Sequence, residues 1–277
     1  MRKMHSQVVV DAENARFWNE LCGSHLARRL RVTELSKESF HRFDEAFLKL
    51  YPYLEQYVPR DSLAGRKVLE IGIGYGTLGQ LLAQRGCEYY GLDIAKSPVD
   101  LMNYRLSLIG PNNPRRVQQG SALAIPHDGA TFDYVYSIGC LHHTGDIRRA
   151  VAEVHRVLKP GGNGVVMLYN RHSLRQLTRG LAMRLHAAFL GKSKHHTEQR
   201  VRAMYDSNSK GEAAPCTEYV SRAEARNLFS AFRHVRIEVQ NFDTVVFLGG
   251  RVVIPRERFL TNLAYVAGLD LYIVAVK

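Results

Sequence analysis

The feature that most constrains the fold of this chain is a glycine-rich segment that directly follows a short apolar run. Val68-Leu69-Glu70-Ile71 is followed by Gly72-Ile73-Gly74-Tyr75-Gly76, and Thr77 begins a stretch with leucines at helical spacing. Aliphatic and β-branched residues favour a buried strand, and the glycines let the backbone turn sharply and approach a ligand closely. A strand, a glycine loop and a helix in this order are typical of a nucleotide-binding α/β unit.

The alternation of strands and helices continues beyond the glycine loop. The sequence predicts four further strands of the same series, at residues 89–94, 116–119, 132–138 and 164–169. A turn at Lys159-Pro160-Gly161-Gly162 is expected to end the last helix of this series. Two later strands, at 235–239 and 270–276, leave room for a long hairpin-like connection. This spacing predicts an α/β fold with a doubly wound, mainly parallel sheet and right-handed crossovers.

Three regions are expected along the chain. Residues 1–64 are predicted to form a mostly helical N-terminal cap, because phenylalanines recur at helical spacing between residues 40 and 47. Residues 65–170 and 220–277 are predicted to form the core. At residues 171–219 the alternation breaks, and polar, basic and glycine residues mix with short apolar pieces. We interpret this segment as an insertion that acts as a substrate lid.

Composition narrows the function classes without choosing among them. Lysine and arginine outnumber the acidic residues by 38 to 26, which gives a net charge of +12. This excess favours an anionic partner, but the cations are scattered and lack the dense run of a nucleic-acid-binding tail. No apolar run approaches the roughly 20 residues that span a bilayer, and the first residues do not resemble a signal peptide. The four cysteines are too widely spaced for a CxxC motif, so we expect a cytoplasmic protein with free thiols.

Two acidic residues accompany the glycine loop. Glu70 lies two residues before Gly72, in the pattern Glu-x-Gly-x-Gly-x-Gly. An acid at this position would repel a pyrophosphate, but it tolerates a ligand that carries an ammonium and a sulfonium. Asp93 ends the second predicted strand, where a carboxylate can accept hydrogen bonds from both hydroxyls of a ribose.

With Gly91-Leu92-Asp93 and Leu158-Lys159-Pro160-Gly161-Gly162, these motifs resemble those of class I S-adenosylmethionine-dependent methyltransferases over roughly residues 65 to 170. The group that contains the ubiquinone and menaquinone biosynthesis enzymes is particularly similar. The resemblance implies a Rossmann-like seven-stranded sheet with an antiparallel last strand. It implies S-adenosyl-L-methionine as cofactor, with S-adenosyl-L-homocysteine as product, and cofactor contacts from Glu70, Gly72, Gly74, Tyr75, Gly76, Asp93, Ile94, Ser121, Ala122 and Ile138. Many relatives carry an acid where this chain has Ser121, although a serine hydroxyl can still accept a hydrogen bond.

Candidate catalytic residues follow the fourth predicted strand. His142 or His143 could take a proton from an attacking hydroxyl or amine, because an ordinary histidine titrates near neutral pH. The alternative is that a histidine only orients other groups, since methyl transfer mainly requires alignment of donor and nucleophile. No third ligand is spaced for zinc, and carboxylates are missing at the ends of strands four and five, so we expect catalysis without a metal. The residues predicted to contact the substrate are Trp18, Tyr169, Arg171 and His172.

The function predicted from these features is methyl transfer to an oxygen or nitrogen of a small molecule. Arg171 is predicted to anchor an anionic group of that acceptor, because a guanidinium can hold a carboxylate or phosphate bidentately. Methylation of RNA or protein is the alternative that the charge of +12 suggests, and a catalytically idle cofactor-binding protein is a third. A homodimer is one possible assembly.

Overall fold

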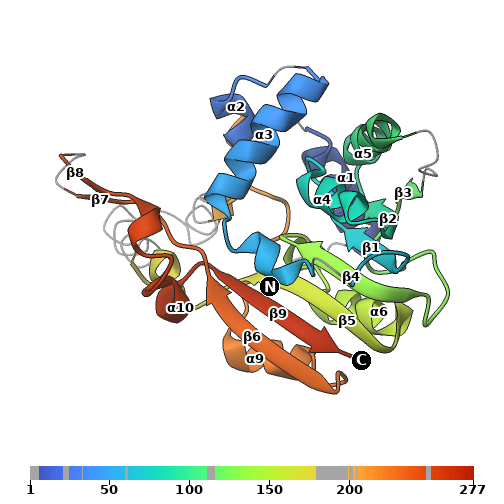
Figure 1. The fold of residues 1–277 in the computed structure, drawn as a ribbon. Helices are drawn as coiled ribbons and strands as arrows, with labels where there is room; N and C mark the ends of the chain where they lie inside the picture. The colour runs from blue at the N-terminus through green and yellow to red at the C-terminus, as the bar shows by residue number, and fades with distance from the viewer. Residues whose placement is uncertain are drawn as a thin grey trace.

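A computed structural model of the chain describes residues 6–20, 25–32, 34–59, 62–110, 116–178, 199, 202–203, 205–247 and 251–277. Its centre is a seven-stranded sheet in the order β3-β2-β1-β4-β5-β9-β6 (Figure 1). The strands are β1 (Lys67–Ile71), β2 (Glu88–Asp93), β3 (Val117–Gln119), β4 (Phe132–Ile138), β5 (Leu158–Tyr169), β6 (His234–Gln240) and β9 (Asp270–Val276). β9 runs antiparallel to both of its neighbours, and the other pairs are parallel. The α/β fold with an antiparallel last strand is therefore confirmed.

Helices cover both faces of the sheet. One apolar cluster packs the helix α6 (Ile147–Val157) and the helix α9 (Arg222–Leu228) against one face. A second cluster packs α4 (Thr77–Gln84), α5 (Lys96–Ile109) and the short 3₁₀ helix at Leu54–Tyr57 against the other. Alternate residues of β1, β2, β5 and β9 enter the two clusters, because successive side chains of a strand point to opposite faces.

The start of β5 differs from the sequence-based prediction. Lys159-Pro160-Gly161-Gly162, predicted to be a turn before the strand, lies within β5, which begins at Leu158. Leu158 pairs with Phe132 and Asn163 pairs with Tyr134, so the intervening residues form an irregularity in the pairing. The left-handed φ of +77° at Gly161 permits this distortion without breaking the strand.

Three helices precede the sheet: α1 (Gln7–Trp18), α2 (His25–Arg29) and α3 (Lys37–Leu50). Ser36 caps α3 by accepting a hydrogen bond from the backbone N–H of Ser39. A buried ion pair joins α3 to the core, because both carboxylate oxygens of Asp44 accept hydrogen bonds from the guanidinium of Arg105, at 2.8 and 2.9 Å. This pairing satisfies a cation that is fully buried.

The connection between β6 and β9 contains the hairpin of β7 (Val245–Phe247) and β8 (Val252–Ile254), the 3₁₀ helix Arg256–Arg258 and α10 (Ala264–Ala267). It extends away from the sheet in Figure 1. Much of the predicted lid, at 171–219, lies outside the described residues, although 205–219 are described and pack against the segment after β4. Within the ranges given above, the structure contains no helix with the length and apolar character needed to cross a membrane.

Candidate functional site

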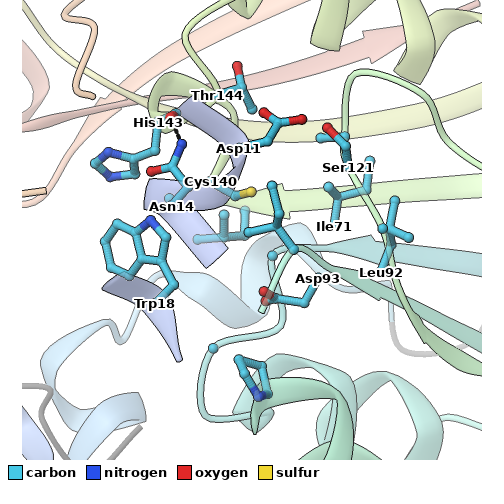
Figure 2. Close-up of a pocket in the computed structure, with 18 residues that line it drawn as sticks. Asp11, Asn14, Trp18, Ile71, Leu92, Asp93, Ser121, Cys140, His143 and Thr144 are labelled. Carbon is cyan, nitrogen blue, oxygen red and sulfur yellow. Dashed lines mark hydrogen bonds between the residues drawn. The ribbon is translucent and has the colours of Figure 1, made fainter. Parts of the chain in front are cut away.

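A pocket that is partly open to solvent lies at the carboxyl ends of β1, β2 and β4 (Figure 2). Ligands of open parallel sheets bind at this edge, because the loops that follow the strands converge there. Nine of the residues predicted from the sequence line it: Gly72, Gly74, Asp93, Ile94, Ser121, Ala122, Ile138, His143 and Trp18. The pocket thus brings together segments that are far apart along the chain.

Asp93 is 7% exposed and lies at the end of β2. Its carboxylate accepts hydrogen bonds from the backbone N–H groups of Ile73, at 2.8 Å, and Ala95, at 2.9 Å. Burial raises the pKa of this carboxyl above its ordinary value, and the backbone N–H groups oppose that shift. The bonds hold the acid against the glycine loop, on the wall of the pocket.

The three glycines of the loop differ in what a side chain would meet at each position. At Gly72 a Cβ would lie 2.3 Å from the Cβ of Cys140, so the absence of a side chain lets the loop pack against the end of β4. At Gly74, where φ is +55°, a Cβ would meet no atom of the described residues within 4 Å. At Gly76 it would meet the side chain of Arg105 at 2.9 Å. Gly74 is therefore the position where the loop exposes its backbone to open space.

Three of the ten residues predicted to bind a cofactor do not line the pocket. Glu70 is 2% exposed and accepts a hydrogen bond of 2.5 Å from the Tyr89 hydroxyl. Burial raises the pKa of Glu70 to about 8. The ring of Tyr75 stacks on Phe43 of α3, with centroids 4.0 Å apart. Gly76 is the third, and it faces Arg105 instead.

The two adjacent histidines have different surroundings. His143 lines the pocket, and its Nδ1 lies 2.7 Å from the carbonyl oxygen of Cys216. We assign a proton to Nδ1, because a carbonyl oxygen can only accept. The other ring nitrogen, Nε2, lies 3.4 Å from Oδ2 of Asp206. In the neutral ring Nε2 therefore keeps its lone pair, and a proton added there would face a carboxylate.

His142 is fully buried and is not among the lining residues. Its ring packs on that of Tyr169, with centroids 4.0 Å apart. Burial, with a smaller contribution from the neighbouring His143, lowers the pKa of His142 well below its ordinary value. This histidine is therefore held neutral inside the core.

One of the four predicted substrate residues lines the pocket, and the other three do not. Trp18 lines the pocket, with its ring 4.9 Å from that of His143. The ring of Tyr169 lies 5.8 Å from that of His143, and its hydroxyl donates a hydrogen bond of 2.9 Å to Asp206. Arg171 is half-exposed, and its guanidinium bonds Glu224 and the carbonyl oxygen of Tyr219. Arg171 and the exposed His172 both lie outside the lining residues.

Sequence reasoning missed two polar residues of α1 that line the pocket, Asp11 and Asn14. With Trp18 they recur at helical spacing, which places all three on one face of α1. That spacing is the only signal in the sequence, and it is a polar one that hydrophobic periodicity does not detect. Cys140 and Thr144, which belong to the same segment after β4 as the two histidines, also line the pocket.

Two chemical expectations concern groups that the structure describes only in part. Of the cysteines described, Cys87, Cys140 and Cys216, none forms a disulfide, whereas Cys22 lies outside the described residues. Across the described ranges, no group of three or more histidine, cysteine, aspartate or glutamate side chains is arranged to hold a metal ion. Catalysis without a metal stays a prediction.

A family model and several curated proteins match the part of the chain that forms the site. The methyltransferase domain family matches residues 69–166. Ubiquinone biosynthesis O-methyltransferases are similar: that of Pseudomonas aeruginosa is 33% identical over 113 residues, which cover 41% of this chain and 48% of the relative. That of Pseudomonas entomophila is 33% identical over 115 residues, with the same coverage. The chain thus spans about half the length of the curated relatives it matches.

Solved structures share the fold at low sequence identity. A SAM-dependent methyltransferase from Archaeoglobus fulgidus aligns with a TM-score of 0.53 and 16% identity, covering 87% of this chain and 97% of that one. Geranyl diphosphate C-methyltransferase from Streptomyces coelicolor, solved with Mg²⁺, geranyl diphosphate and S-adenosyl-L-homocysteine, aligns with a TM-score of 0.52 and 15% identity, covering 96% and 97%. The solved structures show a shared fold, and the family match and the ubiquinone biosynthesis relatives identify residues 69–166 as a class I methyltransferase domain, whose cofactor is S-adenosylmethionine.

Proposed function

We propose that this chain transfers a methyl group from S-adenosylmethionine to an oxygen or nitrogen of a small molecule, without a metal. The observation that carries the proposal is the convergence of seven of the ten predicted cofactor residues on one pocket at the carboxyl edge of the sheet. The similarity to ubiquinone biosynthesis O-methyltransferases supports an oxygen acceptor in particular.

The groups that line the pocket fit this cofactor. Asp93 offers a buried carboxylate for the ribose hydroxyls, and Gly74 leaves open space beside the loop. Ser121 and Ala122 are proposed to flank the adenine, with Ile138 near the amino-acid portion. Asn14 leaves a buried carbonyl oxygen without a hydrogen-bond partner among the described residues. When bound, the cofactor supplies an electrophilic methyl group on a sulfonium.

His143 is the proposed proton acceptor for the attacking hydroxyl or amine. The hydrogen bond from Nδ1 to the carbonyl of Cys216 sets the ring orientation and leaves the lone pair on Nε2. Nε2 is buried and has no hydrogen-bond partner among the described residues, so the acceptor must reach it from the pocket, and a proton taken there gives an imidazolium whose charge is offset by the carboxylate of Asp206. Tyr169 orients Asp206 through its hydroxyl, and Trp18 borders the same region. The neutral, buried His142 supports the ring of Tyr169.

Binding and transfer are tested in two steps. Titration calorimetry with S-adenosylmethionine and S-adenosylhomocysteine is expected to give saturable binding that Asp93→Ala weakens. Extracts are then incubated with the protein and methyl-labelled cofactor, and label is expected in a small molecule by mass spectrometry. Absence of binding would overturn the proposal. Label only in RNA or protein would favour the macromolecular alternative, and binding without any transfer would favour an idle binding protein.

A further inference from the structure

The N-terminal helix forms one wall of the pocket. Asp11, Asn14 and Trp18 of α1 all line it, and their spacing of three and four residues places them on one helix face (Figure 2). Residues 69–166, matched by the methyltransferase domain family, do not include this helix. Any contact that α1 makes with a ligand is therefore additional to those of the matched domain.

Two side-chain hydrogen bonds dock α1 on the segment that follows β4. Gln7 donates from Nε2 to the carbonyl oxygen of Thr144, and Asn14 donates from Nδ2 to that of His143, both at 2.8 Å. Close packing reinforces them, because a Cβ at Gly145 would lie only 3.1 Å from Cγ1 of Val10. The polar face of α1 is thus held in a defined position over the pocket.

Asn14 has one acceptor left over. The residue is 4% exposed, and its Oδ1 has no hydrogen-bond partner among the described residues, whereas its Nδ2 donates to the carbonyl oxygen of His143. Buried polar atoms nearly always have a partner, so this oxygen is available to accept a hydrogen bond from a donor in the pocket. Asn14 lines the pocket and is bonded to the segment that follows β4, close to where the proposed function puts the amino-acid portion of the cofactor. The donor available there is the α-ammonium group.

Asp11 lies three residues before Asn14 on the same face of α1, and it brings a carboxylate to the pocket. Gln7 donates to its Oδ1 at 2.8 Å, and Figure 2 shows the carboxylate on the side of the pocket where Ser121 lies. Asp93 is the other acidic residue that lines the pocket, and its oxygens accept backbone hydrogen bonds. The carboxylate of Asp11 is chemically suited to accept a hydrogen bond from the exocyclic amine of adenine.

We propose that α1 is a cofactor-recognition element, in which Asn14 Oδ1 accepts a hydrogen bond from the α-ammonium group of the cofactor and Asp11 accepts one from the adenine amine. This inference rests on the proposed function, because it assumes that the pocket binds S-adenosylmethionine. It assigns to α1 the selectivity for an amino acid at one end of the ligand and for adenine at the other.

The two proposed contacts are tested separately by measuring the affinities of three ligands by calorimetry. S-adenosylhomocysteine carries both donors, 5′-methylthioadenosine lacks the amino-acid portion, and S-inosylhomocysteine has an oxygen in place of the adenine amine. Asn14→Ala is expected to weaken S-adenosylhomocysteine about 10- to 100-fold more than it weakens 5′-methylthioadenosine, since both ligands lose the docking bond of α1 but a hydrogen bond to a charged group is lost only in the first. Asp11→Ala is expected to weaken both adenosine ligands by about 10-fold and to spare S-inosylhomocysteine.

Gln7→Ala is the matched control for Asn14→Ala, because it removes the other docking bond of α1, together with the bond from Gln7 to Asp11, and changes no residue that lines the pocket. It is expected to weaken S-adenosylhomocysteine and 5′-methylthioadenosine by equal factors. The same equal loss in Asn14→Ala would overturn the contact with the ammonium and leave only docking. If Asn14→Ala does not fold, Asn14→Asp keeps an acceptor oxygen, and it is expected to preserve the preference for S-adenosylhomocysteine over 5′-methylthioadenosine. Loss of that preference in Asn14→Asp would also overturn the contact.

Failure of the inference is distinguishable from failure of the proposed function. If the parent protein binds none of the three ligands, the proposed function itself is wrong. If the parent binds S-adenosylhomocysteine and the Asn14 and Asp11 variants bind all three ligands as the parent does, only the role of α1 is overturned. Circular dichroism of each variant confirms that the comparison is made between folded proteins.

Discussion

The side-chain amide of Asn14 donates a hydrogen bond to the backbone carbonyl of His143, 2.8 Å away and 129 positions later in the chain. The ring of the same histidine bonds the carbonyl oxygen of Cys216, 73 positions further on. His143 therefore joins the N-terminal helix, the segment after β4 and the described end of the insertion. A change in any of these three segments is therefore expected to alter the position of His143 in the pocket.

Replacing Asp93 with alanine is expected to weaken S-adenosylmethionine binding while the domain stays folded. A carboxylate that holds both ribose hydroxyls contributes two charge-assisted hydrogen bonds, on the order of 2 to 4 kcal/mol together. Affinity should therefore fall by about 30-fold or more in calorimetry. Asp93→Asn is the matched variant, because it keeps the size and one acceptor oxygen, and its loss should be smaller. An unchanged affinity in folded Asp93→Ala would remove this residue from the site.

Gly74→Val is expected to abolish cofactor binding almost completely. The backbone at Gly74 has a φ of +55°, and a side chain there would extend into open space beside the loop. A β-branched residue is strained in this conformation and would fill the room that the ligand needs. Gly65 is a suitable control, since it also has a left-handed φ, of +69°, and does not line the pocket. Normal cofactor affinity in a folded Gly74→Val protein would contradict the assignment of the glycine loop.

His143→Gln is expected to lower kcat/KM by about 100-fold, a typical contribution of a general base, and to remove the acidic limb of its pH profile. Glutamine keeps polar atoms but cannot accept the proton at the working pH. His142→Gln is the control, because the pKa of the buried His142 is lowered well below its ordinary value and the ring stays neutral. Steady-state kinetics with the identified acceptor decide between them. A pH profile shared by the parent and both variants would eliminate histidine as the base.

Glu70→Gln is expected to make the ligand-free protein more stable at neutral and mildly alkaline pH. Burial raises the pKa of Glu70 from 4.5 to about 8, so the folded state takes up a proton that the unfolded state has lost. Its contribution to stability is fully present below about pH 4.5 and is lost as the pH rises to about 8, at up to roughly 1.4 kcal/mol per pH unit. Glutamine has no such proton uptake. The free energy of unfolding, measured with urea at about pH 5 and about pH 8, should change less between the two pH values in the variant than in the parent. An equal change in the two proteins would contradict this account.

Several features of the fold followed from the sequence because they depend on local chemistry. The glycine loop after Ile71 requires backbone conformations that side chains disfavour, and the apolar runs of β1 and β4 leave little choice but buried strands. Asp93 could be placed because an acid that ends the second strand of such a unit must lie at the edge where the loops converge. These constraints operate within a few residues, so a sequence pattern is enough to reveal them.

Other features depend on contacts between segments that are distant in the chain, and only the tertiary structure decided them. Glu70 turns toward Tyr89, and Arg171 pairs with Glu224, although both were predicted to face a ligand. His142 and His143 are adjacent and chemically identical, yet one is buried against Tyr169 while the other lines the pocket. The sequence determined which reactive groups stand at the edge of the sheet. Packing determined which of them reach the pocket, because the direction and solvation of a side chain depend on neighbours that no local pattern specifies.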